Sequence, residues 1–207
     1  ISSGDYDLND AVIDGFNNEV TNEDIFSIPV STNDGVNQMH LYYAAAAFNG
    51  RGDVEIQQKH LDLYDSEDDR GGLFYVDAGS GDWRTEKWKN QYGFVKVVRL
   101  AEMHLIRAEA NARLGTSVGA SPLEDINAIR TRSGLVALGS VDLDGILNER
   151  RLELAHEGHR IHDIKRLKLS VVEGATTYMY DDPNLLFPVP QRERNLNGSL
   201  TQNTGYF

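Results

Sequence analysis

Apolar residues in the second half of the chain recur at steps of three and four positions, which is the spacing of one face of a helix. From residue 95 this pattern continues to Gly115, a residue type common at helix ends. The apolar positions are Val98, Ala101, Leu105, Ala108 and Ala112. The pattern predicts one amphipathic helix over residues 95–115, and its small residues would let a neighbouring helix approach closely.

Two further helices are predicted downstream. Ser121 is a typical cap, Pro122 suits the first helical position, and Glu124 stands three residues after the cap. This second helix would run to Gly134 and form a hairpin with the first. A third would begin near Asp142 and continue to residue 166, with an apolar side made of Leu147, Leu154, Ile161 and Ile164. One helix pair cannot bury both of its faces, so another element must pack on it.

The first ninety residues give weaker signals. A short amphipathic helix is predicted within residues 5–18, and the β-branched run at 25–30 predicts a strand, which Pro29 would place at an edge. Between residues 31 and 90 the periodicity breaks down, and only residues 54–64 indicate a helix. A loop region of that length usually has a function, because ordering it costs backbone entropy. The tail at 185–207, which contains Pro188 and Pro190, should be extended.

Composition and charge exclude several classes of function. The 207 residues include 20 Lys and Arg against 32 Asp and Glu, so the net charge is −12. Such a charge repels phosphate backbones and anionic lipid, and we expect no nucleic-acid partner. The sequence contains no cysteine, which excludes disulfides, thiolate metal sites and cysteine nucleophiles. The longest uncharged apolar run, residues 41–48, is far shorter than a membrane-spanning helix.

Three stretches of the sequence form a recognisable set. They are RLAEMHLIRAEA at 99–110, NERRLELAHEGHR at 148–160, and FPVPQRE at 187–193 followed by LTQNTGY at 200–206. In this order, they resemble the SusD/RagB family of outer-membrane nutrient-binding lipoproteins. The resemblance implies a mainly α-helical SusD-like fold with a tetratricopeptide-type helix pair, long loops and few short strands. Departures from residues frequent in the family imply altered packing in the same fold; they are His156, Ile161, His162 and Thr204.

The resemblance also implies that residues 1–207 are the C-terminal portion of a single SusD-like domain. Its loop-rich ligand-binding part would cover about 19–94, its helical scaffold about 95–170 and its extended tail about 171–207. The first residues carry no signal segment, so a lipidated cysteine and the first helical repeats would lie upstream of Ile1. Membrane attachment would come only from that lipid, on the outward face of the outer membrane. Without the repeats, the stripe from Val98 to Ala112 would be exposed, and we expect this piece alone to associate or misfold.

Histidines and acids form the candidate metal sites. The stretch from His156 to His162 lacks the His-Glu-x-x-His spacing of zinc proteases, because residue 160 is Arg, and we interpret these histidines as scaffold. The loop at 140–145 resembles half of an EF-hand but has Arg151 at its twelfth position. The acids from Asp65 to Asp69 lack the EF-hand glycine. Solvated loop charge is the favoured interpretation there, with a calcium ion as the weaker alternative, and we expect no other cofactor.

Aromatic residues gather in the loop region beside short polar side chains. Sugars suit such a surface, because their C–H faces stack on aromatic rings while their hydroxyls bond to polar side chains. The alternative is that most of these rings belong to the core. We expect Trp88 to be buried, whereas Trp83 follows an exposed glycine-rich turn and fits either interpretation equally. The candidate ligand contacts are Trp83, Tyr75, Tyr42, Asp82 and Arg84, with Asn49 and Arg51 beside them.

The leading hypothesis is a surface nutrient-binding protein and not an enzyme. The resemblance implies that it binds an oligosaccharide and delivers it to a SusC-like TonB-dependent transporter. A glycoside hydrolase on the same scaffold is one alternative, since 32 acids leave room for a catalytic carboxylate pair. A protein-binding adhesin or assembly subunit is another. The sequence has no nucleophile elbow and no phosphate-binding glycine motif.

Overall fold

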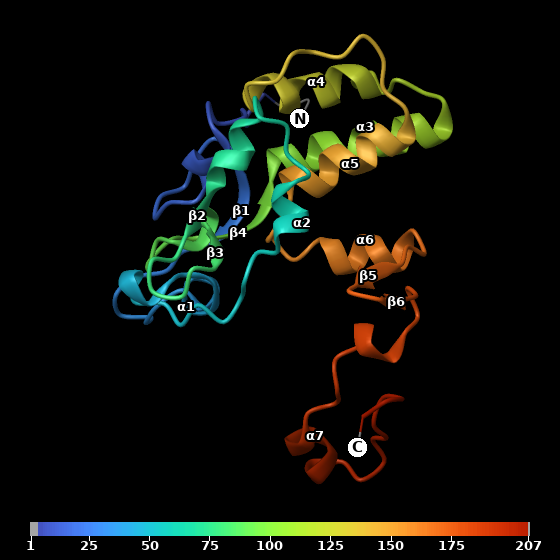
Figure 1. Ribbon diagram of the computed structural model, residues 1–207. Coiled ribbons are helices and arrows are strands. Elements are labelled where there is room, and N and C mark those ends of the chain that lie inside the picture. Colours follow the sequence, from blue (N-terminus) through green and yellow to red (C-terminus); the bar gives the residue numbers. More distant parts are fainter. Residues whose placement is uncertain (1–3, 207) are drawn as a thin grey trace. The chain divides into compact units, whose positions relative to one another are not determined.

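The chain divides into two compact units, Ile1–Leu154 (unit 1) and Ala155–Phe207 (unit 2). The computed structural model describes residues 4–206 (Figure 1). Helices predominate, and the strands are short and form three separate pairs. This arrangement confirms the mainly α-helical class with long loops. The boundary between the units falls inside the region expected to form the helical scaffold.

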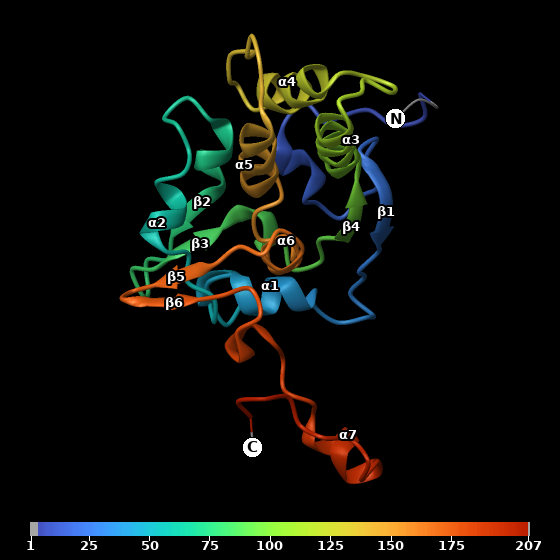
Figure 2. The same cartoon turned by 90° about the vertical axis from the view of Figure 1, so that its right-hand side faces the viewer.

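Three helices make up the helical part of unit 1: α3 (Leu100–Leu114), α4 (Pro122–Arg132) and α5 (Leu143–Glu153). The helix α3 packs against both α4 and α5, so α3 and α4 are the expected hairpin (Figure 2). The capping box at α4 is present as predicted: the Glu124 amide donates to Ser121 Oγ, and the Ser121 amide donates to Glu124 Oε2 at 2.7 Å. Gly115 ends α3 in the left-handed conformation that glycine tolerates.

The apolar stripe of α3 is buried inside unit 1. Ala101, Leu105 and Ala108 are all 0% exposed. The residues that cover them come from α4, α5 and the end of α5: Ile126, Ile129, Ile146 and Leu154. The expected exposure of this stripe is therefore wrong, because α5 supplies the packing that the helix pair lacks. The stripe gives no reason for the piece to associate.

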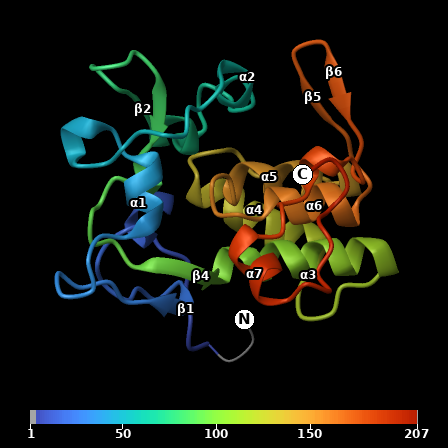
Figure 3. The same ribbon diagram turned by 90° about the horizontal axis from the view of Figure 1, so that it is seen from below.

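The first helix begins later than its apolar spacing predicts. Residues Val95–Arg99 form the strand β4, which pairs antiparallel with β1 (Asp24–Ile28) and leads directly into α3 (Figure 3). Val98 thus lies in a strand. Valines favour extended backbone, and β1 offers them hydrogen-bond partners, which outweighs the helical spacing. The strand predicted at 25–30 is confirmed, with Pro29 directly after it.

The predicted third helix is two helices. The helix α5 ends at Glu153, and α6 (Arg160–Arg166) follows in unit 2. Between them, His156 has φ 64° and Gly158 has φ 86°, backbone conformations that an α-helix cannot contain. The buried face of α5 also differs from the expected one, since Ile146 is fully buried and Leu147 only partly.

The predicted N-terminal helix shrinks to one 3-10 turn, Val12–Gly15. The Asn9 amide donates to Glu23 Oε2, and Asn9 Nδ2 donates to Thr21 Oγ1, so this segment is tied to the residues before β1 instead of coiling. The turn still buries its apolar residues. Val12 and Phe16 form a second small core with Trp88, whose predicted burial is confirmed at 3% exposure.

Residues 31–90 are largely irregular, as expected. They contain two short helices, α1 (Gln38–Tyr43) and α2 (Gln58–Leu61), and several 3-10 turns. The helix α2 lies within the predicted 54–64 segment, whereas α1 was not predicted. The strands β2 (Phe74–Val76) and β3 (Trp83–Thr85) form an antiparallel hairpin. In Figure 3, α1 and β2 lie on one side of unit 1, and α3, α4 and α5 lie on the other.

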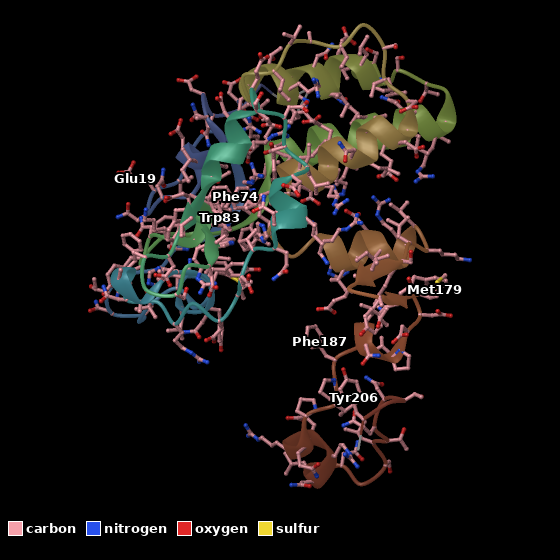
Figure 4. All side chains as sticks on the ribbon, viewed as in Figure 1. Glu19, Phe74, Trp83, Met179, Phe187 and Tyr206 are labelled. Atoms are coloured by element: carbon pink, nitrogen blue, oxygen red, sulfur yellow. The ribbon has the colours of Figure 1, made fainter. Side chains whose placement is uncertain are left out.

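Unit 2 contains α6, a hairpin of β5 (Val171–Glu173) and β6 (Thr176–Tyr178), and the short helix α7 (Gln191–Leu196). The helix α7 corrects the expectation of a wholly extended tail. Side chains near the end of the chain brace the proline-rich segment. Asn203 Nδ2 donates to the Phe187 carbonyl at 2.6 Å, and the Tyr206 hydroxyl donates to the Leu186 carbonyl at 2.6 Å. Figure 4 labels Phe187 and Tyr206 in this tail.

Candidate ligand-binding platform

The β2–β3 hairpin carries three of the five predicted contact residues. Tyr75 pairs with Arg84 across the hairpin, and Val76 pairs with Trp83. Paired residues point to the same face, and successive residues point to opposite faces. Tyr75 and Arg84 therefore share one face, while Trp83 lies on the face that also carries Phe74 (Figure 4). Trp83 is partly buried, so it is neither the fully exposed ring nor the core ring that the sequence allowed.

The turn of the hairpin is ordered by Asp77. Its carboxylate accepts hydrogen bonds from the Gly79 amide and from Ser80 Oγ, both at 3.0 Å. These bonds, first the one from the Gly79 amide, hold the pKa of Asp77 below its usual range. Asp77 thus stays ionised at neutral pH and is a poor general acid, because a glycosidase acid needs a raised pKa.

Arg84 is buried, and its guanidinium is committed to structure. Its Nη1 donates to the Val54 carbonyl at 2.9 Å, and its Nη2 donates to Asp82 Oδ2 at 2.9 Å. Asp77 Oδ2 lies 3.8 Å away. The sequence brings Arg84 and Asp82 together correctly, but Arg84 is only 3% exposed and locks the hairpin onto the loop around Val54. We therefore assign Arg84 a structural role in the platform, without direct contact to a ligand.

Tyr42 lies near the end of α1 and is 41% exposed. The guanidinium of Arg51 stands 5.3 Å from the centre of its ring, within the range of a cation–π contact. Arg51 also pairs with Asp53 at 2.7 Å. The amide of Asp53 donates to the Tyr42 carbonyl, so loop and helix end form one ordered piece.

A second aromatic group forms around Lys89. The Phe48 and Tyr75 rings meet edge to face with centroids 5.6 Å apart. The ammonium of Lys89 stands 4.3 Å from the Phe48 centroid and 4.6 Å from that of Tyr75. The Tyr75 hydroxyl accepts a hydrogen bond from the Ala45 amide. Next to this group, Asn49 Nδ2 donates to Gln91 Oε1 at 3.3 Å, which places two amide side chains at the surface.

Buried polar contacts hold α1 against the segment that carries Lys89 and Gln91. Asn37 caps α1 by accepting from the Met39 amide, and its Nδ2 donates to the Gly93 carbonyl at 2.6 Å. His40, 0% exposed, lies with Nδ1 3.1 Å from the Lys89 carbonyl. These contacts explain why residues 42 to 91, far apart in sequence, gather in one place. We call the following set the platform: Tyr42, Phe48, Asn49, Arg51, Asp53, Tyr75, Asp82, Arg84, Glu86, Lys89 and Gln91. Trp83, on the opposite face of the hairpin from Tyr75, lies outside this set.

A buried ion-pair network joins the platform side of unit 1 to its helices. Glu153 on α5 is 0% exposed, and its Oε1 accepts from Arg99 Nη2 at 3.1 Å and from Arg132 Nη2 at 2.6 Å. Both arginines also pair with Glu23. Arg70, just before β2, is 3.5 Å from Glu153 Oε2. The charged stretch at 148–166 thus contributes Glu149 and Glu153 to buried ion pairs with arginines.

Sequence reasoning missed Phe48, Lys89 and Gln91 as members of this surface. Their only signal was position, since Lys89 directly follows the aromatic Trp88 and Phe48 ends an alanine run. Neither feature predicts that the two meet across 41 residues. That contact depends on the buried polar anchors of α1, which periodicity cannot detect.

The candidate metal sites do not assemble. Across residues 4–206, no group of three or more His, Asp or Glu side chains is placed to hold a metal ion. In the acidic run at 65–69, Asp68 is buried and holds Arg70 Nε at 2.9 Å and Nη2 at 2.8 Å. Asp142, from the EF-hand-like loop, instead caps α5 by accepting from the Gly145 amide. His156 lies in the break between α5 and α6, so the helical spacing of the histidines is lost.

Comparison with known proteins identifies the family. A model of the SusD family matches residues 75–184, slightly more than half of the 207-residue chain. The chain belongs to the SusD family. The match covers most of the β2–β3 hairpin and the helices α3 to α6, and it contains in full two of the three stretches that carried the resemblance, those at 99–110 and 148–160. No curated protein matches the chain.

Solved structures share the fold. A SusD superfamily protein from Bacteroides vulgatus ATCC 8482 is 25% identical with a TM-score of 0.80, and the match covers 100% of this chain and 52% of that one. Surface glycan-binding protein A from Bacteroides thetaiotaomicron, in complex with laminarihexaose, is 21% identical with a TM-score of 0.81, and the match covers 98% and 56%. The same-named protein from Bacteroides uniformis is 22% identical with a TM-score of 0.77, covering 97% and 53%. This chain thus spans about half the length of these proteins.

Proposed function

We propose that this chain is part of a surface protein that binds oligosaccharides on the platform without cleaving them. The observation that carries the proposal is the platform itself, where exposed aromatic rings stand beside amide and charged side chains in a chain of the SusD family. Tyr42 and Phe48 are the exposed rings of the platform, at 41% and 38% exposure, and are the rings best placed to stack on sugar. Asn49 and Gln91 offer amide groups to its hydroxyls.

Binding without turnover fits the state of the acids around the hairpin. Asp77 and Asp82 are both engaged by Arg84, and Asp53 is engaged by Arg51. A hydrolase needs one carboxyl that holds a proton and a second that acts across the sugar. The acids of the platform are instead each paired with a cation.

The test is titration calorimetry of the chain against neutral oligosaccharides, with laminarihexaose included as the ligand bound by one structural neighbour. Tyr42→Ala and Phe48→Ala should each weaken binding about two- to tenfold, because an aromatic contact contributes about 0.5–1.5 kcal/mol. Phe26→Ala is the matched control, since Phe26 is a 54% exposed ring on β1, outside the platform. Equal affinity in all three variants would remove the platform from the proposal.

The proposal extends to a partner and a location. We propose that the whole protein delivers its glycan to a SusC-like TonB-dependent transporter and is held at the outer membrane by a lipid. Within residues 4–206, no helix is long and apolar enough to cross a membrane. Affinity purification of the full-length protein from its own membranes should recover a β-barrel transporter. Recovery of the protein without such a transporter would contradict the delivery role.

A further inference from the structure

Each cation of the platform lies against a carboxylate. Arg51 Nη2 is 2.7 Å from Asp53 Oδ2, and Lys89 Nζ is 2.9 Å from Glu86 Oε1. Arg84 has the two acids of the hairpin turn, with Asp82 at 2.9 Å. An anionic group that approached one of these cations would also approach its carboxylate. The attraction and the repulsion would then largely cancel.

Two of these cations also make cation–π contacts with the aromatic rings of the platform. Lys89 stands over Phe48 and Tyr75, and Arg51 stands over Tyr42. A cation that turned toward an anionic ligand would leave both its carboxylate and its ring. The cost of losing those contacts would offset much of the new ion pair. The rings and amide groups need no such rearrangement to receive an uncharged sugar.

The charge of the whole chain acts in the same direction. The net charge is −12, so the potential around the molecule opposes the approach of an anion. A site for acidic glycans would need unmatched cations to overcome this field. The three cations of the platform face four carboxylates, those of Asp53, Asp77, Asp82 and Glu86.

We propose that the platform selects uncharged oligosaccharides and discriminates against glycans that carry carboxylates or sulfates. The inference rests on the proposed function and narrows its ligand class. The positive charges of the platform order its aromatic rings and turn, and the ligand is recognised by ring stacking and by neutral hydrogen bonds.

The test compares matched pairs of ligands on the 207-residue chain at low salt. Each member of a panel of neutral hexose oligosaccharides, laminarihexaose included, is paired with the same oligosaccharide after oxidation of its primary hydroxyls to carboxylates. Calorimetry should show at least tenfold weaker binding of the oxidised member. Equal or tighter binding of the oxidised member would overturn the inference while leaving the platform as a glycan site. Binding of neither member would overturn the proposed function and the inference with it.

Variants separate local pairing from overall charge. Glu86→Gln removes the carboxylate that pairs with Lys89, and Asp53→Asn removes the one that pairs with Arg51. Each variant should reduce the ratio of the two affinities, neutral over oxidised ligand, at least threefold. Asp144→Asn changes the net charge by the same amount at an exposed position of α5 and should leave this ratio of affinities unchanged. If Asp144→Asn changed the ratio of affinities as much as Glu86→Gln does, selection by paired cations would be refuted.

Discussion

Three arginines from different segments converge on Glu153. Arg70 precedes β2, Arg99 ends β4 and Arg132 ends α4. Burial alone would raise the pKa of Glu153, but the three guanidinium groups outweigh it and hold that pKa well below its usual range. Arg99 and Glu153 both lie in stretches that resemble the family, so these motifs encode the frame that supports the platform. They carry no information on the ligand.

Glu153→Gln should lower the free energy of unfolding by about 3–5 kcal/mol, because it removes the buried charge that three guanidinium groups share. Urea denaturation at neutral pH measures the loss. Since the folded pKa lies below the unfolded one, the stabilisation is present above the usual glutamate pKa and disappears as the pH falls below it. Glu67→Gln, at an exposed acid, should change stability by less than about 0.5 kcal/mol. Equal stability of the two variants would show that the network contributes little.

His60 gives unit 1 a separate dependence on pH. Its ring stands edge to face with Tyr64 and Phe74, with centroids 5.5 and 5.6 Å away. Burial, with the charges of Arg151 and Lys87, lowers the pKa of His60 to about 4. As the pH falls from about 6.5 toward 4, the unfolded chain takes up a proton first, so stability should decrease across that window.

His60→Phe keeps the ring packing and removes the titration. Its stability should therefore change less between pH 6.5 and 4 than that of the unmodified chain, as followed by thermal melts at several pH values. His162→Gln, at an exposed histidine of α6, should retain the full pH dependence. A His60→Phe profile that matches the unmodified one would assign the pH dependence to other groups.

At the scale of elements, the sequence predicts best where local chemistry decides. The capping box of Ser121 and Glu124 needs only neighbouring residues, and it places the start of α4 correctly. The exchange of helix for strand at Val95–Arg99 depends on β1, about 70 residues earlier in the chain. The turn at Val12–Gly15 likewise depends on hydrogen bonds from Asn9 to more distant residues. Spacing within one segment cannot reveal such partners.

The same limit explains the outcome for the platform. Aromatic composition predicted Tyr42, Tyr75 and Trp83 as candidates, and the structure leaves each of them at least partly exposed. The composition could not show that Arg84 is buried, since an arginine next to a glycine-rich turn is usually exposed. The composition also could not predict the contact between Phe48 and Lys89, because that contact depends on the fold of the whole loop region.

Gly50 is a position in the loop of the platform that has no room for a side chain. A Cβ there would overlap the carbonyl oxygen of Ala44. Gly50→Ala should therefore destabilise the chain by about 1–3 kcal/mol and weaken glycan binding, since Asn49 and Arg51 flank it. Gly72→Ala is the control, because its Cβ would meet nothing within 4 Å. Denaturation and calorimetry on the same samples measure both effects, and an unaffected Gly50→Ala would mean that the loop readily shifts.

At the scale of the whole molecule, the two units differ in how much they bury. Unit 1 contains both hydrophobic cores and the ion-pair network. In unit 2, across residues 155–206, the buried residues are Ala155, Asp163 and Ile164. Several apolar side chains of the tail stand in solvent, among them Phe187 at 88% exposure. Local stability follows buried apolar contact, so the units should open at different free energies.

Hydrogen exchange on the intact chain tests this difference. Backbone amides of α3 and α5 should exchange slowly, near the rate set by global unfolding, because α3 is covered by α4 and α5 around Leu105. Amides of β5, β6 and α7 should exchange at least a hundredfold faster, since their hydrogen bonds have no buried core to protect them. The matched reference is β4, another short strand of five residues, which contains the buried Lys96 and Arg99. Slow exchange in β5 and β6 as well as in β4 would show that a further surface covers the tail, and the low burial of unit 2 would then not describe the protein in solution.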